Sequence, residues 1–100
     1  MVNKRLTSKT ILEKIKKEKK ELKKKGIKKI GLFGSYAKDK QKQKSDIDFL
    51  VEFKTIDLNR YLYVLNLLEK LFRRKVDLVI EKDLKPELTY VKKEAKYVKI

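Results

Sequence analysis

Two aspartates, Asp46 and Asp48, begin a predicted strand and constrain the fold more than any other part of the chain. Side chains alternate between the two faces of a strand, so both carboxylates lie on one face, with Cα atoms roughly 6.6 Å apart. This arrangement requires a sheet that buries one face of the strand and leaves the acidic pair on the other. The opposite face consists of the apolar residues Ile47, Phe49, Val51 and Phe53.

A turn of two small residues, Gly34-Ser35, lies ten residues before the acidic pair and ends the apolar run at Phe33. The following residues, 35–38, predict a short helical turn whose N–H groups suit a phosphate. Residues 38–44 contain no apolar side chain and predict an exposed basic loop. The pattern therefore places a phosphate-binding turn close to two carboxylates.

The remaining elements follow from apolar periodicity and from start and stop signals. Thr10 and Glu13 fit a capping box, with Ser8 as a competing N-cap, and Gly26 suits the end of that helix. Their order predicts one domain over residues 1–100, with an α/β or α+β fold in which helices pack on a small sheet. The predicted elements are helix 8–25, strand 27–33, strand 46–53, helix 57–73, strand 75–80, helix 86–94 and a short edge strand in 95–100.

The predicted helix 57–73 has an amphipathic pattern. Its apolar side chains recur at spacings of three and four residues, and Asp57 or Thr55 suits its start. This pattern predicts one buried stripe along the helix. The predicted stripe consists of Leu58, Tyr61, Leu62, Leu65, Leu68 and Phe72.

A third aspartate, Asp77, interrupts an otherwise apolar strand. Carboxylates are rarely buried unless they are paired or bound to metal. Together with Asp46 and Asp48 it offers an oxygen-only ligand set, which suits Mg²⁺ or Mn²⁺. Two such cations between carboxylates and phosphates can activate a hydroxyl and stabilise leaving pyrophosphate. The residues therefore predict nucleotidyl transfer from a nucleoside triphosphate to a hydroxyl.

Composition narrows the chemistry further. The chain has no cysteine and no histidine, which excludes disulfides, thiolate metal sites, serine triads and the usual zinc sites. It has no run of 18 apolar residues and no apolar segment of signal-peptide length, so no membrane span and a cytoplasmic location are expected. The net charge of +15 fits either an anionic partner or the lysine-rich surface of a heat-adapted protein.

The spacing of Gly34-Ser35 and Asp46-Ile47-Asp48 resembles the signature of the DNA polymerase β-like nucleotidyltransferase superfamily. The flanking Gly-Leu-Phe-Gly-Ser-Tyr-Ala, Ser-Asp-Ile-Asp-Phe-Leu-Val and Lys-Val-Asp-Leu-Val are similar too. Over residues 10–98 the chain looks most like the minimal nucleotidyltransferases (MNT). The resemblance implies a mixed sheet flanked by helices. It also implies metal binding by Asp46, Asp48 and Asp77, and triphosphate binding by Gly34 and Ser35.

The chain departs from the family pattern directly after the turn. The family usually continues Gly-Ser-x-Ala-Arg-Gly, whereas this chain has Lys38 and Asp39 at the last two positions. Lys38 keeps a positive charge for the phosphates without the bidentate fork of arginine. Asp39 is expected to add a negative charge near those phosphates.

The resemblance also implies a partner, because 100 residues are expected to form one domain, with no second domain to grip an acceptor. Minimal members are typically encoded beside a helical HEPN toxin of RNase type. The implied function is Mg²⁺-dependent transfer of AMP from ATP to a tyrosine of that toxin, with two metal ions, by an antitoxin in a hetero-oligomer. Two alternatives remain. One is a non-catalytic module that covers its partner, and the other is a nucleic-acid-binding protein that uses the lysine-rich helix 8–25.

Overall fold

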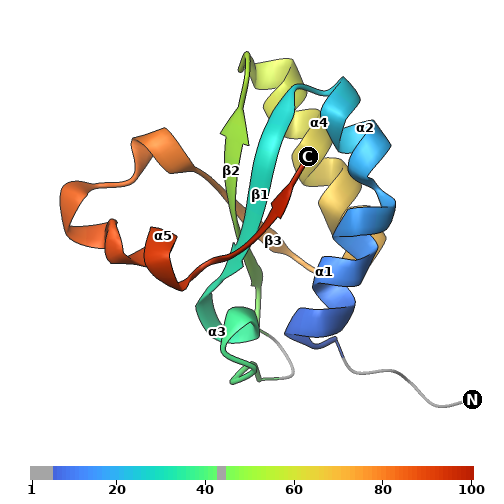
Figure 1. Ribbon diagram of the computed structural model, residues 1–100. Coiled ribbons are helices and arrows are strands. Elements are labelled where there is room, and N and C mark those ends of the chain that lie inside the picture. The colour runs from blue at the N-terminus through green and yellow to red at the C-terminus, as the bar shows by residue number, and fades with distance from the viewer. Residues whose placement is uncertain (1–5, 43–44) are drawn as a thin grey trace, which may run out of the picture.

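The computed structural model describes residues 6–42 and 45–100, in which four strands form one mixed sheet (Figure 1). The strand order is β3-β2-β1-β4. β1 pairs antiparallel with β2 and with β4, and β2 pairs parallel with β3. The predicted mixed sheet is confirmed. The strands are β1 (Ile27–Phe33), β2 (Ile47–Phe53), β3 (Val76–Ile80) and β4 (Lys96–Lys99).

Helices cover one face of this sheet, where α1 (Ser8–Lys17), α2 (Lys19–Lys24) and α4 (Leu58–Phe72) lie (Figure 1). Alternate residues of β2 point toward them, and the rings of Phe49 and Phe72 lie 5.9 Å apart. The core between the two layers is apolar. Its fully buried members include Ile11, Ile15, Leu22, Ile30, Leu32, Phe49, Val51, Val64 and Leu68.

The first predicted helix is divided in two. The helix begins at Ser8, as predicted, but its N-cap is Thr7 and neither Ser8 nor Thr10, so the predicted cap was wrong. The Thr7 hydroxyl accepts from the Thr10 N–H, and the Thr10 hydroxyl accepts from the Thr7 N–H. The backbone of Glu18 leaves helical geometry (φ −92°, ψ 11°), which separates α1 from α2. Gly26 follows α2 with φ +84°, as a C-terminal glycine should.

The bounds of α4 agree with the prediction to one residue at each end, but its buried face does not. Leu58 and Leu62 are 70% and 44% exposed, whereas Val64 is fully buried. At about 100° per residue, Leu62 lies roughly 160° around the helix from Val64. Both leucines fit the three- and four-residue spacing of the predicted stripe. Apolar residues occur on both of these faces of the helix, so spacing alone does not identify which face is buried.

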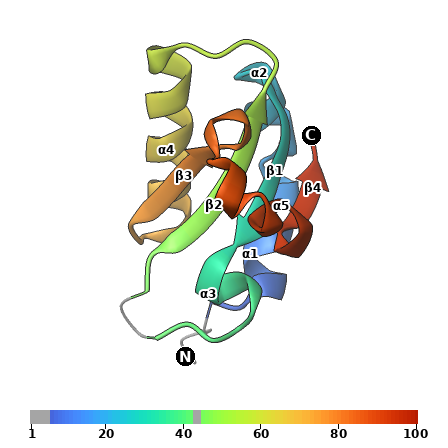
Figure 2. The same cartoon turned by 90° about the vertical axis from the view of Figure 1, so that its left-hand side faces the viewer.

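The segment after β3 lies over the other face of the sheet (Figure 2). It contains two 3₁₀ turns, Glu81–Asp83 and Pro86–Leu88, and the short helix α5 (Tyr90–Glu94), so the predicted continuous helix 86–94 was wrong. Residues 85–90 are all exposed and lack the apolar contacts that stabilise a longer helix. The predicted edge strand near the C-terminus is confirmed as β4. Within the described ranges, no helix has the length and apolar character needed to cross a membrane.

Candidate active site

Asp48 and Asp77 are direct partners in the parallel ladder of β2 and β3. Ile47 and Phe49 on either side of Asp48 are fully buried toward the helices. Alternation therefore places both carboxylates on the opposite face, the one away from α1, α2 and α4. Asp46 directly precedes β2, which begins one residue later than predicted. The structure thus brings Asp48 and Asp77 side by side, and Asp46 lies two residues before Asp48 in the chain.

The charges of these groups influence one another. Burial, and then the charges of Asp77 and Asp46, raise the pKa of the half-buried Asp48 from 3.8 to about 6. Such a shift is typical of a carboxylate at a functional site, where like charges gather at a partly buried point. In residues 6–42 and 45–100, however, no three acidic side chains are placed closely enough to hold a metal ion.

The turn after β1 contacts Asp48 directly. Gly34 has φ +74°, and a Cβ added there would clash with Asp48 Oδ2 and lie 3.0 Å from its Cγ. Only glycine therefore lets the carboxylate approach this turn. α3 (Gly34–Ala37) begins here, one residue earlier than predicted. Ser35 is partly buried, and within the described ranges no hydrogen bond involves its hydroxyl. The hydroxyl is thus available to a phosphate.

Lys38 and Asp39 follow α3 and point to different partners. Lys38 Nζ lies 3.4 Å from Glu94 Oε2 of α5, and both side chains are about half exposed. The Asp39 carboxylate accepts hydrogen bonds from Ser8 N and Ser8 Oγ at 2.9 and 3.0 Å. These bonds, helped by the charge of Lys96, lower the pKa of Asp39.

Asp39 therefore anchors the start of α1 instead of lying free near a phosphate. Its φ of +53° explains why the family pattern has glycine at this position, since aspartate is one of the few other residues that adopt this conformation. Sequence reasoning missed both Ser8 as its partner and Glu94 as the partner of Lys38. Neither contact has a local signal, because each joins residues far apart in the chain.

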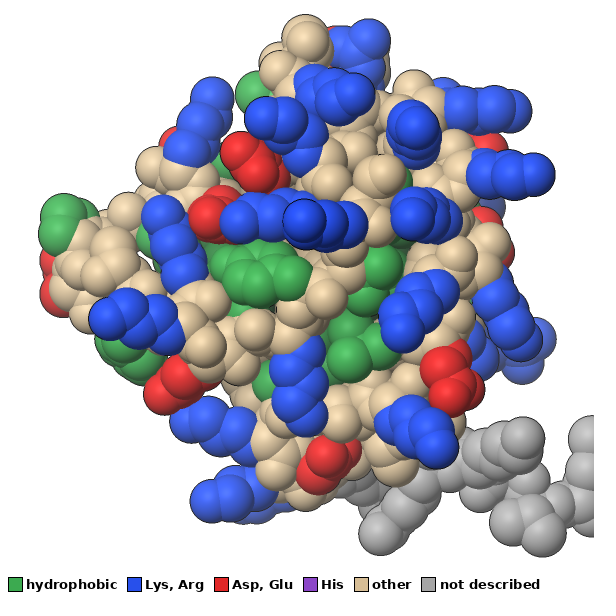
Figure 3. Space-filling model, viewed as in Figure 1, with side chains coloured by type: hydrophobic (Ala, Val, Ile, Leu, Met, Phe, Trp, Pro, Cys, Tyr) green, Lys and Arg blue, Asp and Glu red, His purple; other side chains and the backbone are tan. Residues whose placement is uncertain are grey.

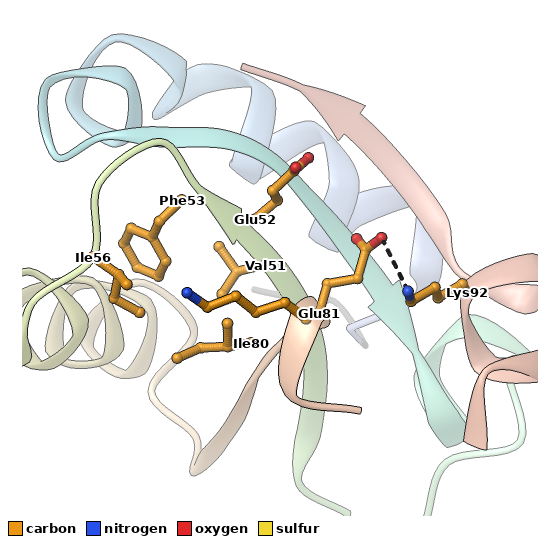
Figure 4. A pocket seen from close by; sticks show the side chains of 8 residues that line it. Val51, Glu52, Phe53, Ile56, Ile80, Glu81 and Lys92 are labelled. Carbon is orange, nitrogen blue, oxygen red and sulfur yellow. Dashed lines mark ion pairs between the residues drawn. The ribbon is translucent and has the colours of Figure 1, made fainter. Parts of the chain in front are cut away.

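A separate cavity of about 280 Å³ lies at the far end of β2 and β3 (Figure 4). Apolar residues such as Val51 and Ile80 line one side, and the other side carries the ion pair of Lys92 and Glu81, 3.9 Å long. None of the predicted site residues lines it. The candidate active site is therefore the acidic face beside Gly34.

Comparison with known proteins identifies the family. A family model described as polymerase beta nucleotidyltransferase matches residues 13–98. The chain belongs to this nucleotidyltransferase family. A solved structure described, provisionally, as a minimal nucleotidyltransferase superposes with a TM-score of 0.80, covering 94% of this chain and 98% of that one at 27% identity. A toxin–antitoxin crystal structure with AMP-PNP gives a TM-score of 0.68 at 28% identity, covering 85% of this chain and 69% of that one.

Curated relatives of this nucleotidyltransferase occur in Methanocaldococcus jannaschii and Thermococcus cleftensis. MJ1379 of Methanocaldococcus jannaschii, provisionally named a protein adenylyltransferase, is 43% identical over 67 residues, 64% of this chain and 65% of its own. MJ0126 of the same organism, with the same provisional name, is 40% identical over 93 residues, 83% of this chain and 93% of its own. The protein adenylyltransferase MntA of Thermococcus cleftensis is 42% identical over 57 residues, 56% of this chain and 58% of its own. The chain thus spans just under two thirds of MJ1379.

Proposed function

We propose that this nucleotidyltransferase transfers AMP from ATP to a hydroxyl of a partner protein. The observation that carries the proposal is the pairing of Asp48 with Asp77 beside the glycine turn at Gly34. The names of the relatives support adenylyl transfer, and the structural neighbour with AMP-PNP supports an adenine nucleotide.

The residues at this face fit a divalent cation in their donor chemistry. Asp46, Asp48 and Asp77 offer only carboxylate oxygens, which Mg²⁺ and Mn²⁺ prefer. The raised pKa of Asp48 reflects a concentration of negative charge that a cation would relieve. We propose these three residues as the ligands of Mg²⁺, with two ions in the complete site. Because no three acidic side chains in the described ranges are already close enough to hold an ion, they would have to draw closer together when it binds. When bound, the cations would neutralise phosphate charge and increase the acidity of the attacking hydroxyl.

The chain's own residues orient the reactants. We propose that Gly34 and Ser35 hold the triphosphate, with Lys38 contributing charge. The acceptor oxygen attacks the α-phosphorus, and the bond from that phosphorus to the bridging oxygen of the β-phosphate breaks. Pyrophosphate leaves with the electrons of that bond, and the hydroxyl proton passes to the exposed carboxylate of Asp77. The products are an AMP ester and pyrophosphate.

The acceptor that we propose is a tyrosine of a HEPN-type toxin, which this chain would inactivate as an antitoxin in the cytoplasm. The toxin–antitoxin assignment of the structural neighbour with AMP-PNP supports such a partner. The test is to combine the chain, ATP and Mg²⁺ with the protein encoded beside it and to measure the mass of that protein. We expect one or more AMP units on tyrosine. An unchanged mass with a correctly folded pair would contradict the proposal.

A second candidate is a non-catalytic antitoxin that neutralises its partner by covering it. The absence of any three closely placed acidic side chains in the described ranges favours this reading. The combined variant Asp46→Asn and Asp48→Asn separates the two. If cells that express the toxin stay protected by this variant, covering suffices. If protection is lost while the two proteins still co-purify, AMP transfer is required.

Replacing Glu94 with glutamine should lower the KM for ATP. Glu94 pairs with Lys38 across 3.4 Å and competes with phosphate for its charge. Because the pair is exposed, we expect a decrease of about twofold to fivefold, which shrinks in high salt. The matched control is Glu87→Gln, which removes the same charge from a residue that forms no ion pair in the described ranges. A similar decrease in both variants, or an increase with Glu94→Gln, would rule out Lys38 as a phosphate ligand.

A further inference from the structure

A groove of about 390 Å³ lies at the end of the sheet farthest from the candidate active site. It is formed by the end of α2, the start of β1 and the residues at the ends of β2 and β4. Four residues of β1, 30–33, separate Lys29 in its lining from the glycine turn at Gly34, a distance of roughly 17 Å. We call this the lysine groove. It is lined by Lys23, Ile27, Lys28, Lys29, Glu52, Lys54, Lys99 and Ile100.

The charge of the lysine groove is strongly unbalanced, because five of its eight lining residues are lysines and one is acidic. Lys29 already has partners, since its Nζ lies 3.6 Å from Glu81 Oε2 and 4.5 Å from the centre of the Tyr97 ring. No ion pair within residues 6–42 and 45–100 involves the other four lysines, all of which are exposed. These four are Lys23, Lys28, Lys54 and Lys99.

The positive charge continues beyond the groove. Figure 3 shows Lys and Arg side chains spread over this whole face of the molecule, with only scattered acidic side chains. Protein surfaces usually mix positive and negative side chains. An acidic partner protein therefore seldom presents an uninterrupted negative surface that is complementary to a long positive one. A nucleic-acid backbone carries one negative charge at every phosphate and does match it. The charge pattern therefore favours nucleic acid over an acidic protein.

The lining and the volume of the groove indicate which nucleic acid it would bind, RNA or DNA, single strand or duplex. Among the described residues no aromatic ring lines it, so binding would depend on phosphates and not on base stacking. Its one acidic side chain, Glu52, cannot attract a phosphate but can accept a hydrogen bond from a ribose 2′-hydroxyl. DNA lacks this hydroxyl. A hollow of about 390 Å³ is too small to receive a whole duplex, but it can take part of the backbone of one strand.

We propose that the lysine groove binds the backbone of single-stranded RNA, with four lysines on phosphates and Glu52 on a 2′-hydroxyl. This site is separate from the nucleotide site and does not depend on the proposed AMP transfer. The lysine-rich outer face of α1 is a different possible contact, because the lysines of the groove come from α2, β1, β4 and the turn after β2.

The test is fluorescence anisotropy with a short, labelled, uridine-only RNA and the matching thymidine DNA. Four phosphate contacts on a single strand predict a slope of about −2.8 for log K against log salt, a loss of roughly 50-fold between about 50 and 200 mM salt. In the variant that carries Lys23→Gln, Lys28→Gln, Lys54→Gln and Lys99→Gln, the slope should approach zero. Glu52→Ala should abolish a preference for RNA over DNA of about fivefold, the typical value of one hydrogen bond.

The matched control removes four exposed lysines outside the groove, none of which forms an ion pair in the described ranges. It carries Lys70→Gln, Lys75→Gln, Lys85→Gln and Lys93→Gln, and it should keep the salt slope of the unmodified chain. Melting curves check that both variants fold. Equal losses in the two variants would show that only net charge matters and would overturn the proposal. Equal affinity for RNA and DNA, or equally strong competition by poly-glutamate, would also overturn it.

Discussion

Replacing Asp48 with asparagine will lower AMP transfer by about a thousandfold or more and raise the melting temperature of the metal-free protein. An amide is a poor ligand for Mg²⁺, so the variant loses charge stabilisation of several kcal/mol in the transition state, which corresponds to roughly this factor in rate. The loss should appear in kcat, because the carboxylate acts on the reacting phosphate rather than on the adenine base.

The gain in stability follows from the raised pKa of Asp48, which is about 6 in the folded chain against 3.8 ordinarily. A shift of about two units corresponds to about 3 kcal/mol, which solvent screening of this half-buried group reduces to about 1 kcal/mol. Because the folded state prefers the protonated form, this penalty is absent below pH 3.8 and complete once the pH exceeds about 6. Asparagine removes it, so at neutral pH the variant should melt about 4–8 °C higher.

Asp83→Asn is the matched control, since Asp83 is exposed in the first 3₁₀ turn and has no ion pair in the described ranges. It should leave both the rate and the melting temperature nearly unchanged. Thermal melts in chelator across the pH range test the linkage, and the stability gain of the Asp48 variant should disappear in acid. A variant that keeps its activity, or that melts lower at neutral pH, would contradict the assignment of Asp48.

The strands of this fold could be predicted from sequence because their signals are local. The alternation of Ile47, Phe49 and Val51 fixes which face of β2 is buried, and with it the face that carries Asp48. The helices were harder to predict, because tertiary contacts decide which face of a helix is buried. Leu62 fits an apolar stripe in the sequence, yet the sheet beneath α4 selects the face around Val64.

The sequence proposes the members of the candidate site, which stay a prediction, but it does not indicate their contacts. The spacing of the glycine turn and the aspartates identifies the family, whereas the pairing of Asp48 with Asp77 depends on which strands become neighbours. Asp39 shows the limit most clearly. Its charge is visible in the sequence, but the hydrogen bonds with Ser8 that direct it to α1 join residues 31 positions apart.

Replacing Gly34 with alanine will lower both stability and activity, for two reasons that can be separated. A φ of +74° costs an alanine about 1–2 kcal/mol. The new Cβ also clashes with the Asp48 carboxylate, which must move away from the turn. Since a misplacement of about 1 Å can cost a hundredfold in rate, we expect AMP transfer to fall by about that factor.

Gly26→Ala controls for the backbone cost alone. Gly26 has φ +84°, but the nearest atom to an added Cβ is Thr55 O at an ordinary 3.4 Å, far from the aspartates. This variant should lose similar backbone stability and keep the activity of its folded fraction. The measurements are thermal melts and initial rates at a temperature where both variants are folded. Equal rates in the two alanine variants would refute a role for Gly34 in seating Asp48.

A double-mutant cycle isolates the clash itself. If the Cβ at position 34 destabilises the chain by pressing on Asp48, then Asp48→Ala should relieve that part of the cost and leave only the backbone term. Gly34→Ala should therefore destabilise the Asp48→Ala background by about 1 kcal/mol less than it destabilises the unmodified chain. Additive effects would mean that the turn and the carboxylate do not touch, and the candidate site would then lack the contact that joins its phosphate-binding turn to its metal ligands.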